Sequence, residues 1–504
     1  MKKLGFVIDN RKCIGCHACT TACKSEHEVP LGVNRTWVKY IEEGSFPDTT
    51  RSFSVMRCNH CTDAPCVEMC PVTALYIRED GIVDFDNKRC IGCKACTQAC
   101  PYDALYIDPV SSTAAKCNFC SHRVDVGLEP ACVVVCPEHA IVAFDMNDPN
   151  SEGSLLLAQN ATTVRKPEKK TSPNLFYIDA VPASLEPSLT SRQDYLWSAQ
   201  ATGVGKNKNQ QFPASGSNHQ EDSSHARRVY DAPDKGILWG WEVVGYLNTK
   251  AVAAGLMLVL SFLYFSGFEL SFQTILLTAC VSLLFMLLTA ALLIKDLKQP
   301  KRFLYIVFRP QFKSWLARGT YIILSFCAVL AFTILGAWME WKEYTRIMLI
   351  ISVPMAVLTT IYTAYLFGQA KGRAFWKNNF SPFFMLSHAC IFGVMGMSLI
   401  LVQPLHELYP TLQFTHIIAL LFTIALFLGT QVKESKMASQ MILQGRYKFH
   451  YWGAAIVLGS IVPALLQFFL PGEIIFALSS MLLVMGIIVA GFLFIKIPQL
   501  IPLS

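Results

Sequence analysis

The sequence predicts an α+β domain followed by an all-α bundle of eight transmembrane helices. Two observations predict this fold class. Sixteen of the 19 cysteines lie before residue 137 in four groups of four, and short segments with the alternation of β-strands separate the groups. From residue 237 onward, long apolar runs dominate, and each is long enough to cross a bilayer. We therefore expect three regions along the 504 residues, namely 1–148, 149–236 and 237–504.

The four cysteine groups are built on one pattern. They are Cys13-x2-Cys16-x2-Cys19-x3-Cys23, Cys58-x2-Cys61-x4-Cys66-x3-Cys70, Cys90-x2-Cys93-x2-Cys96-x3-Cys100 and Cys117-x2-Cys120-x11-Cys132-x3-Cys136. Four thiolates per group is the ligand count of a [4Fe–4S] cluster, and the first and third groups have the spacing of bacterial ferredoxins. The sequence thus predicts a ferredoxin-like domain with four clusters, and a protein that holds four clusters transfers electrons.

Two other uses of cysteine compete with clusters. Disulfide frameworks belong to small secreted domains, and residues Met1–Asn10 contain no apolar run long enough for a signal peptide. A zinc ribbon needs two CxxC pairs per metal, whereas here a fourth cysteine follows at x3 and three of these are followed by proline. We therefore favour clusters. The cysteines of the apolar half, Cys280, Cys327 and Cys390, are expected to be small apolar side chains.

Short strands are expected between the cysteine groups. Ala74–Ile77 and Ile82–Phe85 alternate around Glu79-Asp80-Gly81, which predicts a hairpin. Ala104–Ile107 and Ala140–Phe144 are expected to repeat the strand that follows each fourth cysteine. The domain is therefore interpreted as an internal duplication of a ferredoxin unit.

The interval from Cys70 to Cys90 has hairpin length, so the second and third groups are expected to pair, which leaves the first and fourth for each other. The four groups, with the long insertion in the fourth, resemble the iron–sulfur subunit of the membrane-bound dimethyl sulfoxide, polysulfide, tetrathionate and sulfite oxidoreductases, which are molybdoenzymes. The resemblance implies a nested set of ligands. Cluster 1 would use Cys13, Cys16, Cys19 and Cys136; cluster 2 would use Cys58, Cys61, Cys66 and Cys100; cluster 3 would use Cys90, Cys93, Cys96 and Cys70; cluster 4 would use Cys117, Cys120, Cys132 and Cys23.

Residues 149–236 are expected to form a partly disordered linker. Val164–Lys170 is a run of charges, and Ala214–Arg228 is rich in Ser, His, Gln and charged residues. Leu175–Asp179 is a candidate strand. Two interpretations stay open, an arm that grips a partner and a tether between two once-separate subunits, and we favour the tether after Gln200.

Eight apolar segments are predicted to span the membrane. They are 243–267, 272–294, 319–338, 346–368, 382–403, 413–432, 451–470 and 474–496. Fifteen Lys and Arg residues lie in the loops on the side of the N-terminal domain, whereas the opposite loops carry only Lys342 and Arg346. This distribution predicts a bacterial inner-membrane protein with its clusters in the cytoplasm, and the periplasm is the alternative. It does not form a patch for nucleic acid, despite a net charge of +7.

The apolar half also resembles the eight-helix, usually haem-free, quinone-reacting subunit of the polysulfide reductase type. The resemblance is carried by Trp239–Tyr246, Ala253–Gly255, Asp296–Tyr305, Arg309–Gly319 and Tyr451–Gly453. It implies a quinone site in this half, and two subunits that are often separate polypeptides are fused here.

Polar residues near the cluster-side ends of the helices are candidates for the quinone site. The candidates are Glu242, Tyr246, Lys250, Tyr362, Tyr365, Gln369 and His388. The alternatives are that Lys250 extends to the lipid headgroups and that His388 has its hydrogen-bond partner on a neighbouring helix. Haem is not expected, because His388 and His416 are at different depths and form no axial pair.

Together these features predict an electron-transfer and membrane-anchor subunit. It would relay electrons between a quinone pool and a separate, large molybdopterin catalytic subunit, without a site for the substrate reaction in its own chain. Cytoplasmic clusters favour a sulfite-type dehydrogenase, and a dimethyl sulfoxide or polysulfide terminal reductase is the alternative. A haem-containing cytochrome b module, a stand-alone ferredoxin:quinone oxidoreductase and a purely structural adaptor are the rivals.

Overall fold

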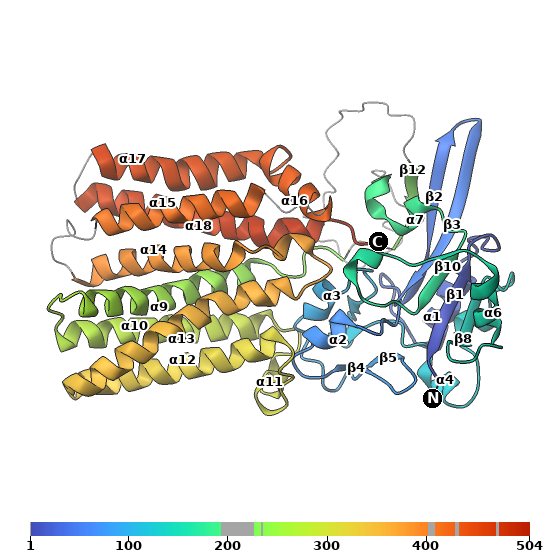
Figure 1. Cartoon of the computed structure of the whole chain (residues 1–504), viewed down its shortest axis with the longest axis horizontal. Helices are drawn as coiled ribbons and strands as arrows, with labels where there is room; N and C mark the ends of the chain where they lie inside the picture. Colours follow the sequence, from blue (N-terminus) through green and yellow to red (C-terminus); the bar gives the residue numbers. More distant parts are fainter. Residues whose placement is uncertain (1, 193–225, 233–234, 402–408, 429–432, 470–472) are drawn as a thin grey trace. The chain divides into compact units, whose positions relative to one another are not determined.

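The computed structural model describes residues 2–192, 226–232, 235–401, 409–428, 433–469 and 473–504 (Figure 1). The chain divides into two compact units. The cysteine unit comprises Met1–Leu238 together with Pro502–Ser504, and the helical unit comprises Trp239–Ile501. Most of the tether expected after Gln200 lies outside the described residues.

The cysteine unit contains a four-stranded sheet with the strand order β8-β1-β10-β9. β1 (Leu4–Asp9) is antiparallel to β8 (Ile141–Asp145) and parallel to β10 (Leu175–Ile178), which is paired with β9 (Thr162–Thr163). All six residues of β1 are buried, as expected for a central strand covered on both faces. β10 confirms the candidate strand at Leu175–Asp179.

A second sheet has the order β11-β12-β2-β3. Its long hairpin consists of β2 (Thr36–Ser45) and β3 (Asp48–Arg57), paired along their full lengths. β12 (Ala226–Tyr230) pairs with β2, and β11 (Thr190–Arg192) pairs with β12. The last residue of β3 immediately precedes Cys58, so this hairpin positions the second cysteine group.

Two small hairpins lie next to the cysteine loops. β4 (Leu75–Ile77) and β5 (Val83–Phe85) are antiparallel, which confirms the hairpin predicted between residues 74 and 85. Gly81 in its turn has a φ of 80°, a conformation that glycine adopts without a steric cost. β6 (Tyr106–Ile107) pairs with β7 (Ala114–Ala115), so the strand predicted from residue 104 is shorter than expected.

Short helices carry the third cysteine of each group. They are α1 (Ala18–Glu26), α2 (Pro65–Met69), α3 (Ala95–Ala99) and α5 (Ala131–Val134), while α4 (Ser121–Val124) follows Cys120 and α6 (Glu152–Gln159) and α7 (Pro182–Leu185) come later in the unit. α1 packs against α5 and α2 against α3. This is the arrangement expected if the first group pairs with the fourth and the second with the third.

The helical unit is a bundle of long apolar helices (Figure 1). They are α9 (Trp241–Phe265), α10 (Phe272–Asp296), α12 (Trp315–Trp338), α13 (Lys342–Gly368), α14 (Ser381–Leu401), α15 (Tyr409–Leu428), the π-helical η6 (Phe449–Ile461) continued by α17 (Val462–Phe469), and α18 (Glu473–Leu500). Within the described residues, seven spans are long and apolar enough to cross a membrane, and α15 contributes the shorter apolar stretch His416–Phe427. The protein is therefore an integral, multi-pass membrane protein.

α9 packs against α10, α13, α14 and α18 and is the centre of the bundle. It crosses α14 at two glycines: a Cβ on Gly255 would lie 1.9 Å from the carbonyl oxygen of Ala389, and one on Gly393 would lie 2.1 Å from that of Gly255. Small residues of this kind let two helix backbones approach closely. Lys250 and His388 lie about one and a half turns before the crossing in their respective helices, so the two side chains reach a common depth.

Candidate iron–sulfur relay and membrane cavity

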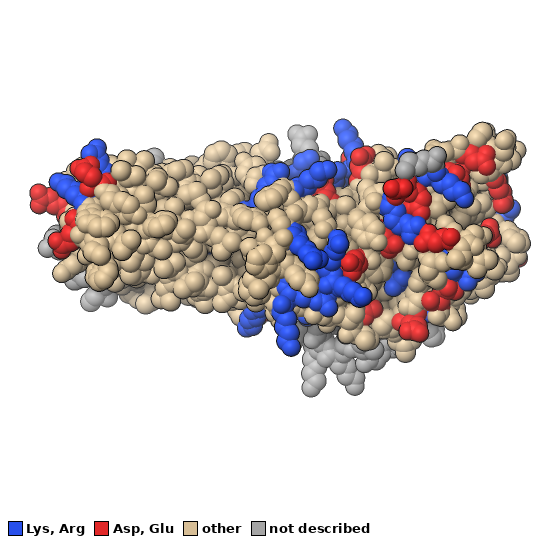
Figure 2. All heavy atoms as spheres, turned by 90° about the horizontal axis from the view of Figure 1, so that it is seen from below, with Lys and Arg blue, Asp and Glu red and all other residues tan. Residues whose placement is uncertain are grey.

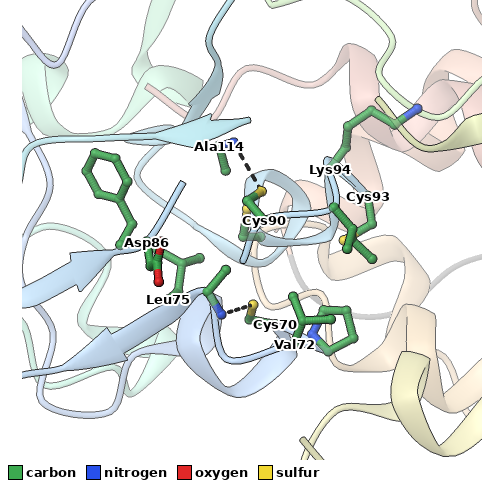
Figure 3. Close-up of a pocket in the computed structure, with 13 residues that line it drawn as sticks. Cys70, Val72, Leu75, Asp86, Cys90, Cys93, Lys94 and Ala114 are labelled. Carbon is green, nitrogen blue, oxygen red and sulfur yellow. Dashed lines mark hydrogen bonds between the residues drawn. The ribbon is translucent and has the colours of Figure 1, made fainter. Parts of the chain in front are cut away.

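Two cavities in the cysteine unit are each lined by four cysteines from two different groups. One is lined by Cys70, Cys90, Cys93 and Cys96, and Figure 3 shows three of these cysteines around it. The other is lined by Cys13, Cys16, Cys19 and Cys136. These are the sets that the resemblance implies for clusters 3 and 1. Four thiols around one cavity are a donor set that fits a [4Fe–4S] cluster.

Cys23 lies with the fourth group rather than with its own. Burial raises the pKa of its thiol, and the charges of Cys117, Cys132 and Cys120 raise it further. His27, one turn after Cys23, places Nε2 3.2 Å from Sγ of Cys120. This neighbourhood fits the set implied for cluster 4.

Cys100 lies with the second group. Burial raises the pKa of Cys66, and the charges of Cys100 and Cys58 raise it further. Burial and the charge of Cys58 also raise the pKa of Cys61 to about 12, while a hydrogen bond from Thr171 lowers it. This neighbourhood fits the set implied for cluster 2.

The four sets form a series in space. Burial is the main cause of the raised pKa values of Cys19, Cys58 and Cys96. The charge of a cysteine from another set raises each of these pKa values further: Cys132 acts on Cys19, Cys117 acts on Cys58, and Cys66 acts on Cys96. They connect set 1 to set 4, set 4 to set 2, and set 2 to set 3, so the order along the series is 1–4–2–3.

Exposure of the sulfurs follows the same order. All eight cysteines of sets 4 and 2, in the middle of the series, are buried. At the ends, Cys16 of set 1 is exposed, and Cys13, Cys136, Cys90 and Cys93 are partly exposed. A series with enclosed centres and accessible ends can pass electrons between two surfaces of the unit.

Backbone amides donate hydrogen bonds to several of the sulfurs. Ala74 N lies 3.2 Å from Sγ of Cys70, and Ala140 N lies 3.3 Å from Sγ of Cys136. Ala114 N lies 3.4 Å from Sγ of Cys90, as drawn in Figure 3. Hydrogen bonds to ligand sulfurs are one of the means by which a protein sets the potential of an iron–sulfur cluster.

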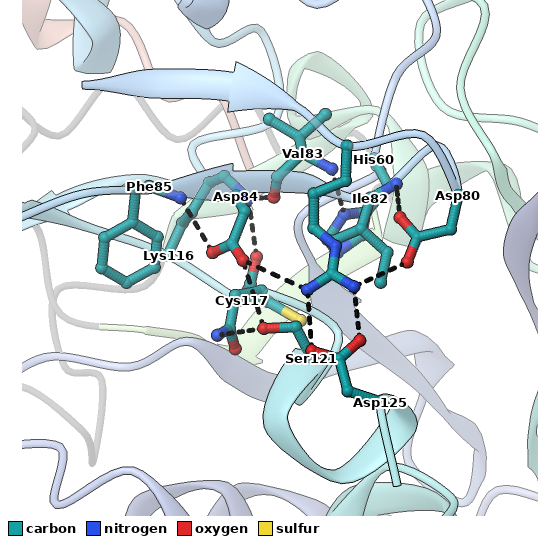
Figure 4. A network of polar contacts seen from close by, with 12 residues as sticks. His60, Asp80, Ile82, Val83, Asp84, Phe85, Lys116, Cys117, Ser121 and Asp125 are labelled. Carbon is teal, nitrogen blue, oxygen red and sulfur yellow. Dashed lines mark hydrogen bonds and ion pairs between the residues drawn. The ribbon is translucent and has the colours of Figure 1, made fainter. Parts of the chain in front are cut away.

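A polar network joins the β4–β5 hairpin to α4, beside Cys117 (Figure 4). Arg78 forms ion pairs with Asp80 at 3.1 Å and with Asp125, and lies 4.0 Å from Asp84. Ser121 Oγ donates to Asp84 at 3.1 Å. The network therefore holds the hairpin between groups two and three against the helix of group four.

A further cavity lies inside the helical unit. Among its lining residues are Lys250 and Asn248 of α9, Thr360 of α13, His388 of α14 and Phe494 of α18. Lys250 is 1% exposed and His388 8%. The structure thus brings two proton-carrying side chains to one space in the bundle.

Lys250 is held by α13. Its Nζ donates to Thr363 Oγ1 at 2.6 Å and to the carbonyl oxygen of Thr360 at 3.3 Å, and it lies 4.5 Å from the ring centre of Tyr362. The alternative that Lys250 extends to the headgroups is therefore not what the structure shows. The sequence did not single out Thr360 or Thr363, because threonine inside a membrane helix is typical of close packing.

The other predicted quinone residues do not line this cavity. Tyr365 stacks on Trp315 at 4.8 Å, and Gln369 accepts from Trp315 N at 3.1 Å, so both face the start of α12. Tyr246 is buried and Glu242 half-buried in the first turns of α9. The face of α13 that meets α9 carries Thr360 and Thr363 instead, because a helix turns about 100° per residue.

Comparison with known proteins finds a protein family that matches each of the two units. A family described as 4Fe-4S dicluster domain matches residues 49–145, and a family described as Polysulphide reductase, NrfD matches residues 232–502. A tetrathionate reductase subunit of Salmonella typhimurium is 45% identical over 200 residues, which are 39% of this chain and 80% of that protein. A polysulfide reductase polypeptide of Wolinella succinogenes is 44% identical over 180 residues, 35% of this chain and 94% of that protein.

A third relative is the arsenate respiratory reductase iron-sulfur subunit of a Shewanella species, 34% identical over 226 residues, 35% of this chain and 96% of that protein. The 4Fe-4S family match falls in the cysteine unit, and the cysteine sets found there fit clusters. The cysteine unit is therefore an iron–sulfur, electron-transfer unit, joined in one chain to a membrane anchor.

Proposed function

The chain belongs to the polysulphide reductase NrfD family and carries a 4Fe-4S dicluster domain in the same polypeptide; from this premise we propose that it relays electrons between a membrane quinone pool and a separate molybdopterin catalytic subunit. The observation that carries the quinone part is the cavity that joins buried Lys250 and His388. Quinol oxidation releases two electrons and two protons. The amine of buried Lys250 and the imidazole of His388 supply a hydrogen-bond donor and a proton acceptor where such a head group would react.

The relay consists of four [4Fe–4S] clusters, each a one-electron carrier when bound, held by the sixteen cysteines in the order 1–4–2–3. The cysteines ligate iron, and the surrounding burial excludes water from the two inner sites. Cys16, with the exposed side chain of Ile14 beside it, marks the end of the series where a catalytic partner docks. The names of the relatives, which are subunits of a tetrathionate reductase and of an arsenate respiratory reductase, support such a partner.

The basic loops support a cytoplasmic position of the clusters. Lys and Arg gather in one band, whereas a long stretch of the helices is almost without charge (Figure 2). With the clusters in the cytoplasm, the function favoured is that of a sulfite-type dehydrogenase that delivers electrons to quinone. The second candidate is a terminal reductase subunit of the polysulfide or dimethyl sulfoxide type, which the relatives' names favour. The direction of turnover of the purified complex distinguishes the two: the first predicts quinone reduction with sulfite as the electron donor, and the second predicts quinol oxidation with polysulfide or dimethyl sulfoxide as the electron acceptor.

Lys250→Met tests the quinone site. Because the variant keeps the aliphatic stem and loses the donor, quinone-linked turnover is expected to fall at least about tenfold, while dithionite still reduces the clusters. Lys295→Met is the matched control, since Lys295 is exposed at the end of α10 over Trp241. Equal turnover in the two variants would remove this cavity as the quinone site.

Composition of the native complex tests the relay itself. Anaerobic purification is expected to yield about sixteen iron atoms per chain, roughly four per cluster, and a large molybdenum-containing subunit that co-purifies. An active chain without that subunit would support a stand-alone ferredoxin:quinone oxidoreductase. A split α-band in the visible spectrum would support the cytochrome b alternative.

A further inference from the structure

Arg57 is a fully buried cation between two of the cysteine sets. It is the last residue of β3, its exposed fraction is 0%, and its guanidinium lies 4.6 Å from the ring centre of Phe6. Nη1 donates to Sγ of Cys132 at 3.1 Å. Nε and Nη2 are buried and have no hydrogen-bond partner among the described residues. Two donors of this side chain are therefore left for a group that lies beside Cys132.

The charges that surround Arg57 are those of cysteine sulfurs. The sulfurs whose charges act on the Arg57 guanidinium are those of Cys132, Cys117 and Cys19. Cys132 and Cys117 belong to set 4 and Cys19 to set 1. A guanidinium stays protonated in proteins, so this site carries a permanent positive charge next to the cysteines of set 4 and near Cys19 of set 1.

A fixed cation has a defined effect on an iron–sulfur cluster. Reduction adds one negative charge to the cluster, and a nearby positive charge stabilises the reduced form more than the oxidised form. Water screens this interaction little here, because Arg57 and Cys132 are both enclosed. Donation of an N–H to a ligand sulfur acts in the same direction.

We propose that Arg57 is a positioning residue that raises the reduction potential of cluster 4 and thereby sets the energy of the electron step between clusters 1 and 4. The inference rests on the proposed relay and adds a specific role for a residue that is not a ligand. A cluster held by Cys117, Cys120, Cys132 and Cys23 would exchange one electron at a time with its neighbours, and the charge of Arg57 would favour its reduced form.

The test is a potentiometric titration, followed by electron paramagnetic resonance, of the complete complex in native membranes with redox mediators. Arg57→Met keeps the stem over Phe6 and removes the charge. At a fixed potential it is expected to lower the reduced-to-oxidised ratio of one cluster at least tenfold, which is about 59 mV for one electron. Arg57→Lys, which keeps the charge, is expected to restore most of the ratio.

Arg51→Met is the matched control, because Arg51 lies on the same strand with its guanidinium about half exposed and paired with Glu42. It is expected to leave all four potentials unchanged. The inference is overturned if Arg57→Met leaves every potential unchanged as in the control, or if it shifts the potentials of all four clusters together by a similar amount. It is also overturned if Arg57→Lys shows the same fall as Arg57→Met.

A third variant is used if Arg57→Met loses iron. If Arg57→Met binds less iron than the wild type, Arg57→Gln is titrated instead, and it is expected to show the same tenfold fall. If both uncharged variants lack iron while Arg57→Lys is fully loaded, the charge serves to hold the cluster, and the tuning role is rejected. Failure of the proposed function is separate: it appears in the wild type, as missing clusters or absent quinone-linked turnover.

Discussion

Lys39 shows how burial decides the charge of a single side chain. Its ammonium group is enclosed in the cysteine unit and donates to the carbonyl oxygen of Ser184 at 3.2 Å. The nearby carboxylate of Asp231 already accepts from Trp37 Nε1 at 2.7 Å and pairs with Arg228 at 3.0 Å. Burial therefore lowers the pKa of Lys39 to about 7, although Asp231 acts to raise it.

This pKa predicts a pH dependence of stability. A lysine in an unfolded chain has a pKa of about 10.4, so between about pH 7 and 10.4 the unfolded chain binds more protons than the folded chain. Stability is therefore expected to rise with pH across this window. Between pH 7 and pH 9, the wild type should gain about 1–3 kcal/mol relative to Lys39→Met. Thermal loss of cluster absorbance at both pH values measures the gain, and identical pH slopes for the two proteins would contradict it.

The residues of the site differ in how far the sequence reveals them. The cysteines were predictable because their spacing is local and repeated. Arg57 was not, because its contact with Cys132 joins residues 75 positions apart, and no local pattern encodes such a contact. Lys250 was predictable, since a lysine within an apolar helix is costly unless it has a function or a partner. Its partner Thr363 gave no signal of its own.

The crossing of α9 and α14 is the element on which the membrane cavity depends. In Gly255→Ala, the new methyl group would meet the backbone of Ala389 at 1.9 Å, so the two helices must separate. We expect markedly less folded protein in the membrane and at least about tenfold lower quinone-linked turnover, because Lys250 and His388 would move apart. Size-exclusion chromatography of detergent extracts and quinol assays measure the two effects.

Gly453→Ala is the control for this substitution. A Cβ on Gly453 has no heavy atom within 4 Å, so the same chemical change is expected to be neutral there. If Gly255→Ala and Gly453→Ala gave equal amounts of folded protein and equal turnover, the close crossing would not be needed for the cavity.

Helices and strands differ in how well the sequence predicts them. The segment predicted at 272–294 is α10 (Phe272–Asp296), because a long apolar run in lipid must satisfy its backbone within its own helix. The parallel pairing of β1 with β10, and the pairing of β12 with β2, join segments that are far apart along the chain. No local pattern encodes such partners, which is why only the hairpin of β4 and β5 was predicted with its pairing.

At the scale of the whole molecule, the chain ends in the unit where it begins. Pro502–Ser504 follow the helical unit but belong to the cysteine unit. Arg228 Nη1 donates to the carbonyl oxygen of Ser504 at 2.7 Å, and Arg165 Nη2 to that of Leu503 at 3.2 Å. Leu503 itself is buried. These three residues therefore contribute to the stability of the iron–sulfur unit.

Leu503→Asp tests this contribution. A carboxylate placed in the buried position is expected to cost at least about 2 kcal/mol and to speed the release of iron to a chelator several-fold. Leu189→Asp is the comparison, because Leu189 lies in the same unit and is 42% exposed. Iron release measured at one temperature in both variants and the wild type decides the matter. Equal rates in all three proteins would mean that the last residues add no stability.

The uneven burial of the sixteen thiols also determines the order in which oxygen destroys the clusters. Oxygen reaches surface sulfur first, so the outer cubes near Cys16 and Cys90 should be destroyed before the two enclosed ones. A preparation handled briefly in air would then retain about half of its iron and its brown colour. It would nevertheless be inactive, because the two outer clusters, which exchange electrons with the redox partners, would be lost. Metal content alone would overstate how much working protein such a sample contains.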